Sequence, residues 1–351
     1  MQQEDCFFMA ESSKKHYMSV DGGGSKLSVI LFDEEHKIVG RGYSGAINPR
    51  FVSDRMIRRN FETGIVDCLK YTGVTHIEKL YIAMPGPVDL FAYMLSKRVK
   101  LNQYRYMSEG ENSLLGGIFA RHGVVALSGT GTGIFHVGGP NGSHMGGWGG
   151  LFDDEGSGYS IGRAALNAAV KSYEQRGPPT LLPELIVEKW QLIRFSDVIN
   201  HVYGSDDYRG LIASLTNLVV ETADRDEVCR IILQTAGVEM AQQVIALFER
   251  DEIRHDLPVM VAGSVWKGNP HMFCAFTKAV TKAIDGVIVH FPWFEAVIGG
   301  AVACLYEKQE TLDATAIAKL KNDFQDFRYQ VGPEIQSAIS TDGGNIVWGP
   351  A

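Results

Sequence analysis

The sequence has 351 residues, which is enough for two domains with a core each. Hydrophobic residues make up 45% of it and charged residues 21%, as in ordinary soluble globular enzymes. The formal net charge of −8 at pH 7 provides no basic stripe for nucleic-acid phosphates or for an anionic membrane surface, so we expect neither partner.

Residues 1–15 are expected to form a polar leader. The chain starts acidic, and its first apolar stretch is only a few residues long, too short for a secretory signal. The five cysteines lack a C-x-x-C pair and any metal-type spacing: Cys6, Cys68, Cys229, Cys274 and Cys304. We therefore expect reduced thiols and a cytoplasmic protein.

Strands and helices alternate through the first third of the chain. We expect strands at 16–20, 27–32, 37–43, 79–84 and 106–107, and helices at 52–71 and 112–121. The helix over 52–71 is indicated by apolar residues at helical spacing, and the strand over 79–84 ends at Pro85-Gly86-Pro87. These elements predict an N-terminal α/β domain over residues 16–122.

The pattern then restarts. We expect strands at 124–128, 133–137 and 258–262, and helices at 157–174, 181–191, 208–222, 227–249 and 295–307. This order predicts a second α/β domain with helical insertions over residues 123–306. A C-terminal extension, 307–351, follows it and contains one expected helix over 314–327.

Each half begins with a hairpin whose turn is rich in glycine and hydroxyl groups. The first turn reads Asp21-Gly-Gly-Gly-Ser25-Lys26, and the second reads Ser128-Gly-Thr-Gly-Thr132. Glycine N–H groups approach phosphate oxygens without side-chain obstruction, so two such turns facing across a cleft would hold a polyphosphate. Asp21 is placed to bind Mg²⁺, and Lys26 to offset phosphate charge. A tight hairpin turn without a ligand explains either turn taken alone.

The two turns differ from the commonest nucleotide-binding loops. Neither contains G-x-x-x-x-G-K-[ST], and Gly22-Gly23-Gly24 lacks the spacing of G-x-G-x-x-G. Dehydrogenase chemistry is therefore excluded.

The stretch from Gly146 to Gly162 is the most informative in the chain. It places Asp153, Asp154 and Glu155 directly before an expected helix start at Ser157. Capping of that helix explains carboxylates at this position. It does not explain the surrounding glycines, which indicate close approach of the backbone to a ligand, with Trp148 as a plate for a sugar ring.

These motifs, together with Val261-Ala-Gly-Ser-Val-Trp266, resemble those of N-acetylglucosamine kinases and of the related ATPases that activate benzoyl-CoA reductase. Matching segments run from about residue 16 to 306. The resemblance implies an actin-like ATPase (ribonuclease H-like) α/β fold, with two duplicated domains around a nucleotide and sugar cleft.

The resemblance also implies roles for individual residues. It assigns ATP binding to Gly22, Gly23, Gly24, Ser25, Lys26, Gly129, Thr130, Gly131, Gly263 and Ser264. It matches Asn48 and Asp154 to positions that bind sugar hydroxyls, and it places Trp148 and Gly149 in the sugar-site loop.

One departure from the family pattern concerns the catalytic base. The family places an Asp where this chain has Glu109, in Ser108-Glu109-Gly110-Glu111, so the carboxylate has an extra methylene. A displacement near 1 Å can cost about a hundredfold in rate. Three explanations stay open: an adjusted pocket with Glu109 as base, transfer of the role to Glu111, or impaired catalysis.

The sequence therefore predicts a sugar kinase that uses ATP and Mg²⁺ to phosphorylate an amino sugar. The resemblance favours N-acetylglucosamine or glucosamine, phosphorylated at O6, and a homodimer. One alternative is an ATPase that activates a radical dehydratase or reductase. In the related family that role requires cysteines that bind an iron–sulfur cluster, and the scattered cysteines of this chain argue against it. Another is a sugar-sensing protein with weak or no kinase activity.

Overall fold

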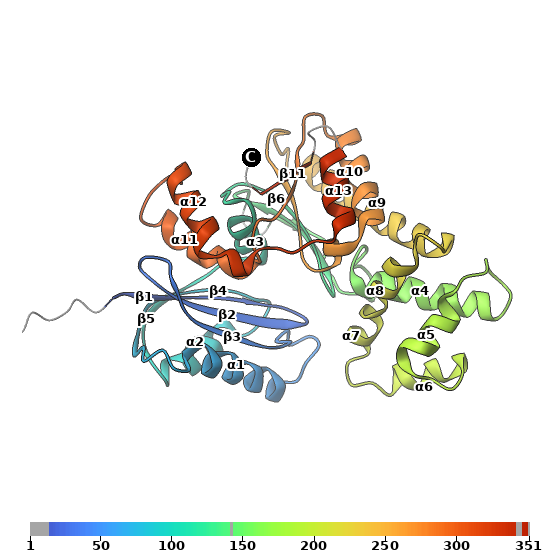
Figure 1. Cartoon of the computed structure of the whole chain (residues 1–351), viewed down its shortest axis with the longest axis horizontal. Coiled ribbons are helices and arrows are strands. Elements are labelled where there is room, and N and C mark those ends of the chain that lie inside the picture. Colours follow the sequence, from blue (N-terminus) through green and yellow to red (C-terminus); the bar gives the residue numbers. More distant parts are fainter. Residues whose placement is uncertain (1–13, 141–142, 342–345, 350–351) are drawn as a thin grey trace, which may run out of the picture.

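The protein is described here by a computed structural model, which covers residues 14–140, 143–341 and 346–349. Most of the expected leader, residues 1–13, and Cys6 lie outside the described residues. Two lobes, each built on a mixed β-sheet, lie side by side, and a group of helices extends from the second lobe (Figure 1).

The first lobe contains a sheet with the strand order β3-β2-β1-β4-β5. Its strands are β1 (His16–Gly22), β2 (Lys26–Asp33), β3 (Ile38–Gly45), β4 (His76–Ala83) and β5 (Lys100–Tyr106). β2 is antiparallel to both β1 and β3, whereas β1, β4 and β5 run parallel to one another. β1 and β2 are nearly fully buried because helices cover both faces of this sheet.

The second lobe repeats this topology with one strand added. The sheet order β11-β10-β9-β6-β7-β8 places β6, β7 and β8 as an antiparallel unit and β9, β10 and β11 parallel to β6. The strands are β6 (Gly123–Ser128), β7 (Thr132–Val137), β8 (His144–Met145), β9 (Val259–Ala262), β10 (Val289–Phe291) and β11 (Ile346–Trp348). The expected duplication of two α/β units is thereby confirmed.

Helices cover both faces of the first sheet. On one face lie α1 (Asp54–Leu69) and α2 (Val88–Ser96), and on the other α11 (Gly299–Tyr306) and α12 (Ala314–Asp323). The start of α1 is fixed by the Ser53 hydroxyl, which accepts a hydrogen bond from Met56 N. Its buried residues Ile57, Phe61 and Ile65 recur at helical spacing and pack on the sheet.

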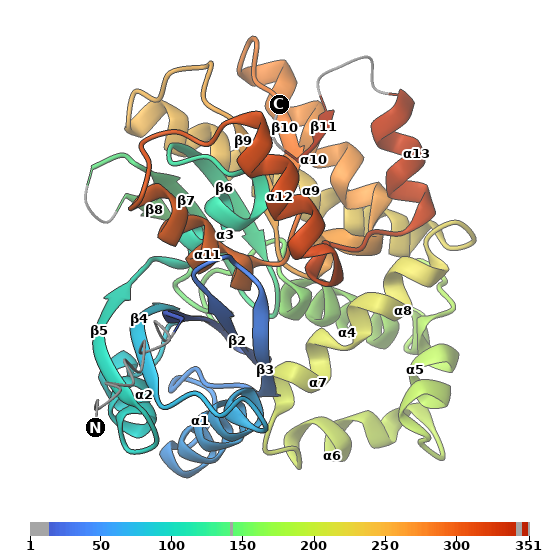
Figure 2. The same cartoon turned by 60° about the vertical axis from the view of Figure 1, so that its left-hand side comes forward.

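The second sheet carries α3 on one face and two long helices on the other. Its helices are α3 (Glu109–Ile118), α9 (Glu227–Arg250), α10 (Pro270–Ala283) and α13 (Pro333–Thr341). Between α3 and α9 an insertion projects from the lobe (Figure 2) and contains α4 (Gly158–Tyr173), α5 (Leu182–Trp190), α6 (Val198–Tyr203), α7 (Tyr208–Ala213) and α8 (Leu215–Thr222).

Helix α9 is apolar over much of its length. Its most apolar window has a mean hydropathy of 1.4, and its 24 residues are enough to cross a bilayer by length alone. Leu233, Met240 and Val244 are fully buried in the core of the second lobe, where α9 packs along α10 and against the sheet. In this fold α9 therefore serves as a core helix.

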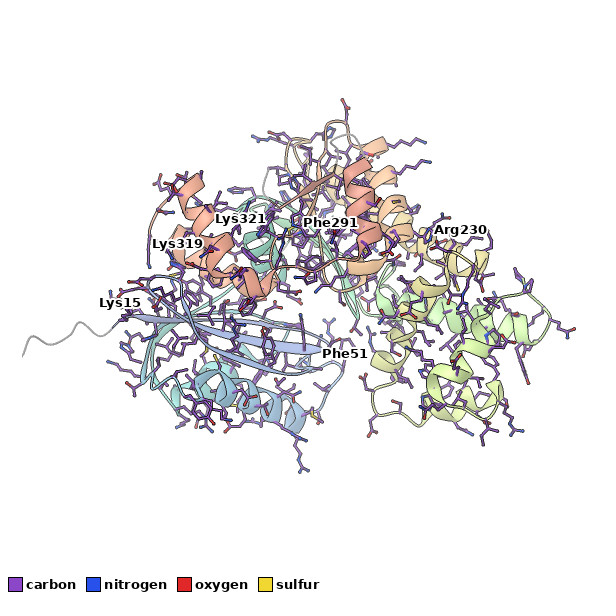
Figure 3. All side chains as sticks on the ribbon, viewed as in Figure 1. Lys15, Phe51, Arg230, Phe291, Lys319 and Lys321 are labelled. Atoms are coloured by element: carbon purple, nitrogen blue, oxygen red, sulfur yellow. The ribbon has the colours of Figure 1, made fainter. Side chains whose placement is uncertain are left out.

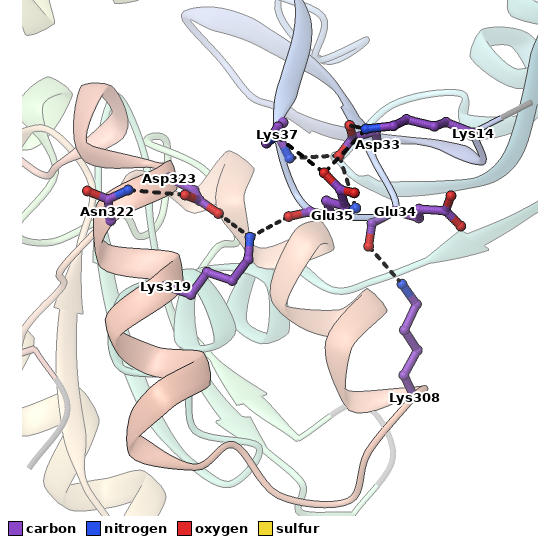
Figure 4. Close-up of polar contacts among 9 residues, drawn as sticks. All are labelled: Lys14, Asp33, Glu34, Glu35, Lys37, Lys308, Lys319, Asn322 and Asp323. Atoms are coloured by element: carbon purple, nitrogen blue, oxygen red, sulfur yellow. Dashed lines mark hydrogen bonds and ion pairs between the residues drawn. The ribbon is translucent and has the colours of Figure 1, made fainter.

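The chain crosses back to the first lobe after β10. Phe294, Val302 and Phe324 belong to the core on the α11 face of the first sheet, and Tyr329 returns to the core of the second lobe. The boundary expected after residue 306 falls inside this crossing segment. Figure 4 shows its polar anchors: Lys308 Nζ donates to the carbonyl of Glu34 at 3.4 Å, and Lys319 Nζ to that of Glu35.

Helices α3 and α11 cross between the lobes at very short range. A Cβ on Gly299 would collide with the carbonyl oxygen and side chain of Asn112, and a Cβ on Gly116 would lie 3.0 Å from Gly299 N. The small residues of 296–304 therefore allow two backbones to touch.

Several elements differ from the sequence expectations. Helix α2 follows Pro85-Gly86-Pro87, where only a turn was expected, and helix α10 and strands β10 and β11 were not expected. The single helix expected over 208–222 is two helices, α7 and α8, joined at Ser214. β10 has three residues, too few for a periodic pattern to identify.

Candidate active site

A cleft of about 740 Å³ lies between the lobes. Fifteen of the sixteen predicted site residues line it: Asp21, Gly22, Gly23, Gly24, Ser25, Lys26, Asn48, Glu109, Gly129, Thr130, Gly131, Gly149, Asp154, Gly263 and Ser264. A second cleft of about 520 Å³ adjoins it and shares Ser25, Gly129, Thr130 and Ser264. Small side chains of α7, α8 and the segment after β9 line this second cleft.

The two glycine turns meet at the junction of these clefts. The hydroxyls of Ser25 and Thr130 are 2.6 Å apart, so one hydrogen bond joins the two lobes. The turns are closed by Gly23 N donating to Lys26 O and by Gly129 N donating to Gly131 O, each at 2.9 Å. Two glycine turns thus meet in one cleft, as a site for a polyphosphate chain between two lobes would require.

A third glycine element ends β9. Gly263 has φ +99°, and a Cβ there would collide with the backbone of Ser128, so only glycine fits. Trp266, fully buried, anchors this segment by donating from Nε1 to the carbonyl of Ala126 at 3.1 Å. Truncating Trp266 to Ala would cost about 3–5 kcal/mol. The hydroxyl of Tyr329, in the C-terminal extension, donates to the carbonyl of Gly263.

Two carboxylates line the cleft beside the glycine turns: Asp21, on β1 of the first sheet, and Glu109, at the start of α3, which packs on the second sheet. Asp21 accepts a hydrogen bond from Asn112 Nδ2 at 3.1 Å, and desolvation raises its pKa to about 6 although Lys26 opposes the shift. Glu109 begins helix α3, and desolvation together with the Asp21 charge raises its pKa to about 7. Both side chains remain partly accessible from the cleft. A carboxylate that gains a proton near neutral pH is suited to general-base work.

Glu111 lies in a different environment. Its carboxylate forms an ion pair with Arg105 at 2.6 Å, and it is not among the residues that line the 740 Å³ cleft. The Ser108 hydroxyl caps α3 by accepting from Glu111 N. Of the two glutamates considered as base, the one that faces the glycine turns is Glu109.

A second group of charged side chains lies in the cleft around Glu295. Glu295 pairs with Lys26 at 3.4 Å and with Lys267, so one carboxylate joins lysines from both lobes. The pairing holds Lys26, which is itself largely exposed, beside the first turn. Sequence patterns missed Glu295 and Lys267 because neither belongs to a glycine motif.

Asp154 is held in an unusual backbone conformation in the wall of the cleft formed by the second lobe. It is buried, has φ +67°, and accepts from Thr132 N at 3.3 Å. Its second oxygen pairs with Arg209 at 2.9 Å. Asn48, from the first lobe, lies on the opposite wall, and its own Oδ1 accepts from Arg50 N at 3.0 Å.

Trp148 is the one predicted site residue that does not line the cleft. Its side chain is 75% exposed, and the neighbouring Leu151 and Phe152 are about as exposed. Gly149 φ is +97°, so the loop turns at that glycine. The placement of Trp148 over a sugar ring stays a prediction.

Asp21 is the residue of the cleft that fits a Mg²⁺ ligand. Mg²⁺ prefers one or two carboxylates together with phosphate oxygens and water. Asp21 offers a desolvated carboxylate with one protein hydrogen bond, next to N–H groups suited to phosphate. Within the described ranges no group of three or more His, Cys, Asp or Glu side chains is arranged for a metal, so the phosphates would have to supply the remaining ligands.

Comparisons with known proteins agree with this geometry. The sequence profile of the BadF/BadG/BcrA/BcrD ATPase family matches residues 19–304. An N-acetylmuramic acid/N-acetylglucosamine kinase of Clostridium acetobutylicum is 29% identical over 275 residues, which cover 75% of this chain and 90% of that protein. An N-acetyl-D-glucosamine kinase of Dictyostelium discoideum is 29% identical over 251 residues, 64% of this chain and 76% of that protein.

Solved structures show the same architecture. A Porphyromonas gingivalis protein, proposed to be an N-acetylglucosamine kinase, superposes with a TM-score of 0.64 at 17% identity, covering 85% of this chain and all of that one. A ROK family glucokinase of Streptomyces griseus, solved with glucose and AMPPNP, superposes with a TM-score of 0.51 at 14% identity, covering 82% and 99%. The expected actin-like kinase fold is therefore confirmed.

Proposed function

The chain belongs to the BadF/BadG/BcrA/BcrD ATPase family, and from this premise we propose that it is an ATP-dependent kinase of amino sugars. Its acceptor is N-acetylglucosamine or glucosamine, phosphorylated at O6. The observation that carries the proposal is the convergence in one cleft of two glycine turns, the Glu109 carboxylate and the buried Asp154. The relatives named as amino-sugar kinases support the choice of acceptor.

ATP would extend across the junction of the two clefts. The triphosphate lies between the glycine turns, and the nucleoside occupies the 520 Å³ cleft beyond Ser264. Backbone N–H groups of both turns and the Lys26 ammonium would stabilise the charge that develops on the transferring phosphoryl group. Mg²⁺, when bound beside Asp21, would neutralise part of the charge on the phosphate oxygens.

Asn48 and Asp154 would bind acceptor hydroxyls and direct one of them toward Glu109. The Glu109 carboxylate accepts the proton of that hydroxyl, and the hydroxyl oxygen of the sugar bonds to the γ-phosphorus of ATP. The bond from this phosphorus to the β–γ bridging oxygen breaks, which releases ADP. A base with a pKa of about 7 is ionised for a large part of the time at neutral pH.

A coupled ADP-release assay tests the proposal. Mg·ATP is supplied with N-acetylglucosamine, glucosamine, N-acetylmuramic acid, N-acetylmannosamine or glucose, and the sugar phosphate is identified by mass spectrometry. Amino-sugar-stimulated ADP release with a stoichiometric sugar phosphate is expected. ATP binding by calorimetry without stimulation by any sugar would refute the kinase and favour an ATPase or a sugar sensor.

The proposal includes three finer expectations. Mg²⁺ should be required for turnover, which EDTA titration measures. The protein should be cytoplasmic, in line with the scattered cysteines. It should form a homodimer, which sedimentation or light scattering would test.

A further inference from the structure

Arg209 is a functional candidate that no sequence motif singles out. It lies on α7 in the helical insertion, far in sequence from every other cleft residue, yet it lines the cleft. Its side chain is only 9% exposed, which is rare for arginine unless it is paired. Such burial needs an explanation in terms of its contacts.

Three groups surround the guanidinium. Its Nη2 donates to Asp154 Oδ2 at 2.9 Å, and both side chains are almost entirely buried. The rings of Phe51 and Tyr159 lie 4.2 and 4.6 Å from its Cζ. Nε is buried with no hydrogen-bond partner in the described part of the chain. The guanidinium is thus held by stacking and by one carboxylate.

The two rings belong to different lobes. Tyr159 is on α4, in the same lobe as Arg209. Phe51 lies in the loop after β3 of the first lobe and reaches the cleft from the opposite wall. Figure 3 labels Phe51 at the end of the first lobe that faces the insertion. Beside it, Arg50 Nη1 donates to the carbonyl of Gly147 at 3.3 Å, which is a second contact across this end of the cleft. Arg209 therefore touches both walls at the acceptor end.

The ion pair also determines what Asp154 can do. Thr132 N and Arg209 Nη2 each hold one oxygen of the Asp154 carboxylate, so its orientation is fixed from two sides. Each oxygen keeps a further lone pair to accept a sugar hydroxyl. An arginine pairs with a carboxylate in a fixed plane, which lysine cannot reproduce.

We propose that Arg209 is a positioning residue for the acceptor: it fixes the Asp154 carboxylate in the orientation that binds the sugar and, through Phe51, ties acceptor binding to the approach of the two lobes. This inference rests on the proposed function. It goes beyond that function by assigning acceptor affinity, and not nucleotide affinity, to a residue of the helical insertion.

The first test compares Arg209→Lys with the control Arg163→Lys. Arg163 donates to the carbonyl of Gly150 at 3.1 Å and lies 6.0 Å from the Tyr159 ring, but it neither lines the cleft nor contacts Asp154. Arg209→Lys is expected to raise the KM for the amino sugar about tenfold or more and to leave the KM for ATP within about twofold. Arg163→Lys is expected to change neither. A purely structural role would lower Tm and change both KM values together.

The second test isolates the contact across the cleft and remains informative if Arg209→Lys folds poorly. Phe51→Leu keeps the ion pair and removes one aromatic face. It should weaken amino-sugar binding about threefold to tenfold, with ATP binding unchanged. An unchanged sugar KM in both Arg209→Lys and Phe51→Leu would overturn the inference.

Direct binding separates this inference from the proposed function. Calorimetry with N-acetylglucosamine in the presence of ADP measures acceptor affinity without turnover. If Arg209→Lys binds the sugar more weakly than the wild type does, and the wild type transfers no phosphate, the inference is supported and the kinase is refuted. If the wild type phosphorylates the sugar and both proteins bind it with equal affinity, the kinase is supported and the inference is refuted. If the wild type binds no sugar, the kinase and the inference are both overturned.

Discussion

The two lobes share a strand topology but divide the chemistry unequally. The turn of the first lobe is preceded by Asp21 and followed by Lys26, and Glu109 begins α3, which comes from the N-terminal half of the chain but packs on the second sheet. The turn of the second lobe carries Thr130 and faces a carboxylate, Asp154, that is already paired with Arg209. In the proposed function the two turns would bind phosphate, the N-terminal half of the chain would supply the proton acceptor, and the C-terminal half would position the acceptor sugar.

The strongest challenge to this division is removal of the base. Glu109→Gln should lower kcat by about 10²- to 10⁴-fold, because the amide cannot accept the hydroxyl proton. Glu111→Gln, two residues away and on Arg105, should stay within a few-fold of wild type. Steady-state ADP release measures both. Comparable losses in the two variants would place the base elsewhere or make the helix α3 terminus important only for structure.

The desolvated Asp21 allows a test of stability. Its pKa is raised to about 6, so in the folded protein the ionised form is disfavoured, and this penalty is present above the folded pKa and disappears at low pH. Asp21→Asn should therefore stabilise the ligand-free protein by on the order of 2 kcal/mol at pH 8, a value limited by the partial contact of the side chain with water. The stabilisation should be much smaller at pH 4.5, where Asp21 is protonated in the folded protein.

Urea unfolding at the two pH values measures this difference, and the same variant should lose Mg²⁺-dependent turnover. Equal stability of Asp21→Asn and wild type at pH 8 would show that the carboxylate is not desolvated.

The raised pKa of Glu109 predicts how the rate depends on pH. The base must be deprotonated, so kcat/KM for the sugar should fall about tenfold per pH unit below a midpoint near pH 7 and level off above it. A rate profile from pH 5.5 to 8.5 measures the midpoint. A flat profile between pH 6 and 8 would contradict Glu109 as the ionising group.

The smallest expected effect concerns the hydrogen bond that joins the two turns. Ser25→Ala and Thr130→Ala each remove one hydroxyl of a pair 2.6 Å apart and should each raise the KM for ATP about fivefold. The double variant should be less impaired than the product of the two single effects, because both remove the same contact. Fully independent effects would show that the hydroxyls act separately on the nucleotide.

Contiguous motifs were predictable, and contacts between distant segments were not. The glycine turns could be identified because a phosphate-binding turn is a local property of five or six residues. The duplicated topology followed from the order of strands and helices. Arg209, Glu295 and Tyr329 come from separate regions of the chain and reach the cleft only through tertiary packing.

Local chemistry also misled at particular positions. Helix α2 was not predicted because Pro85-Gly86-Pro87 suggested a turn. Proline is nevertheless tolerated at the start of a helix, and Pro87 directly precedes α2. Ser214, where one expected helix becomes two, gives no sequence signal of a break.

The crossing of α3 and α11 gives the cleft a mechanical property. Asn112 presents its backbone to Gly299 at the point where the helices touch, and its side chain donates to Asp21. Asn112 therefore belongs both to the contact between the two helices and to the hydrogen bond that holds the Asp21 carboxylate. A rotation of one lobe on the other about this crossing would move Asn112 and, through its hydrogen bond, the carboxylate of Asp21.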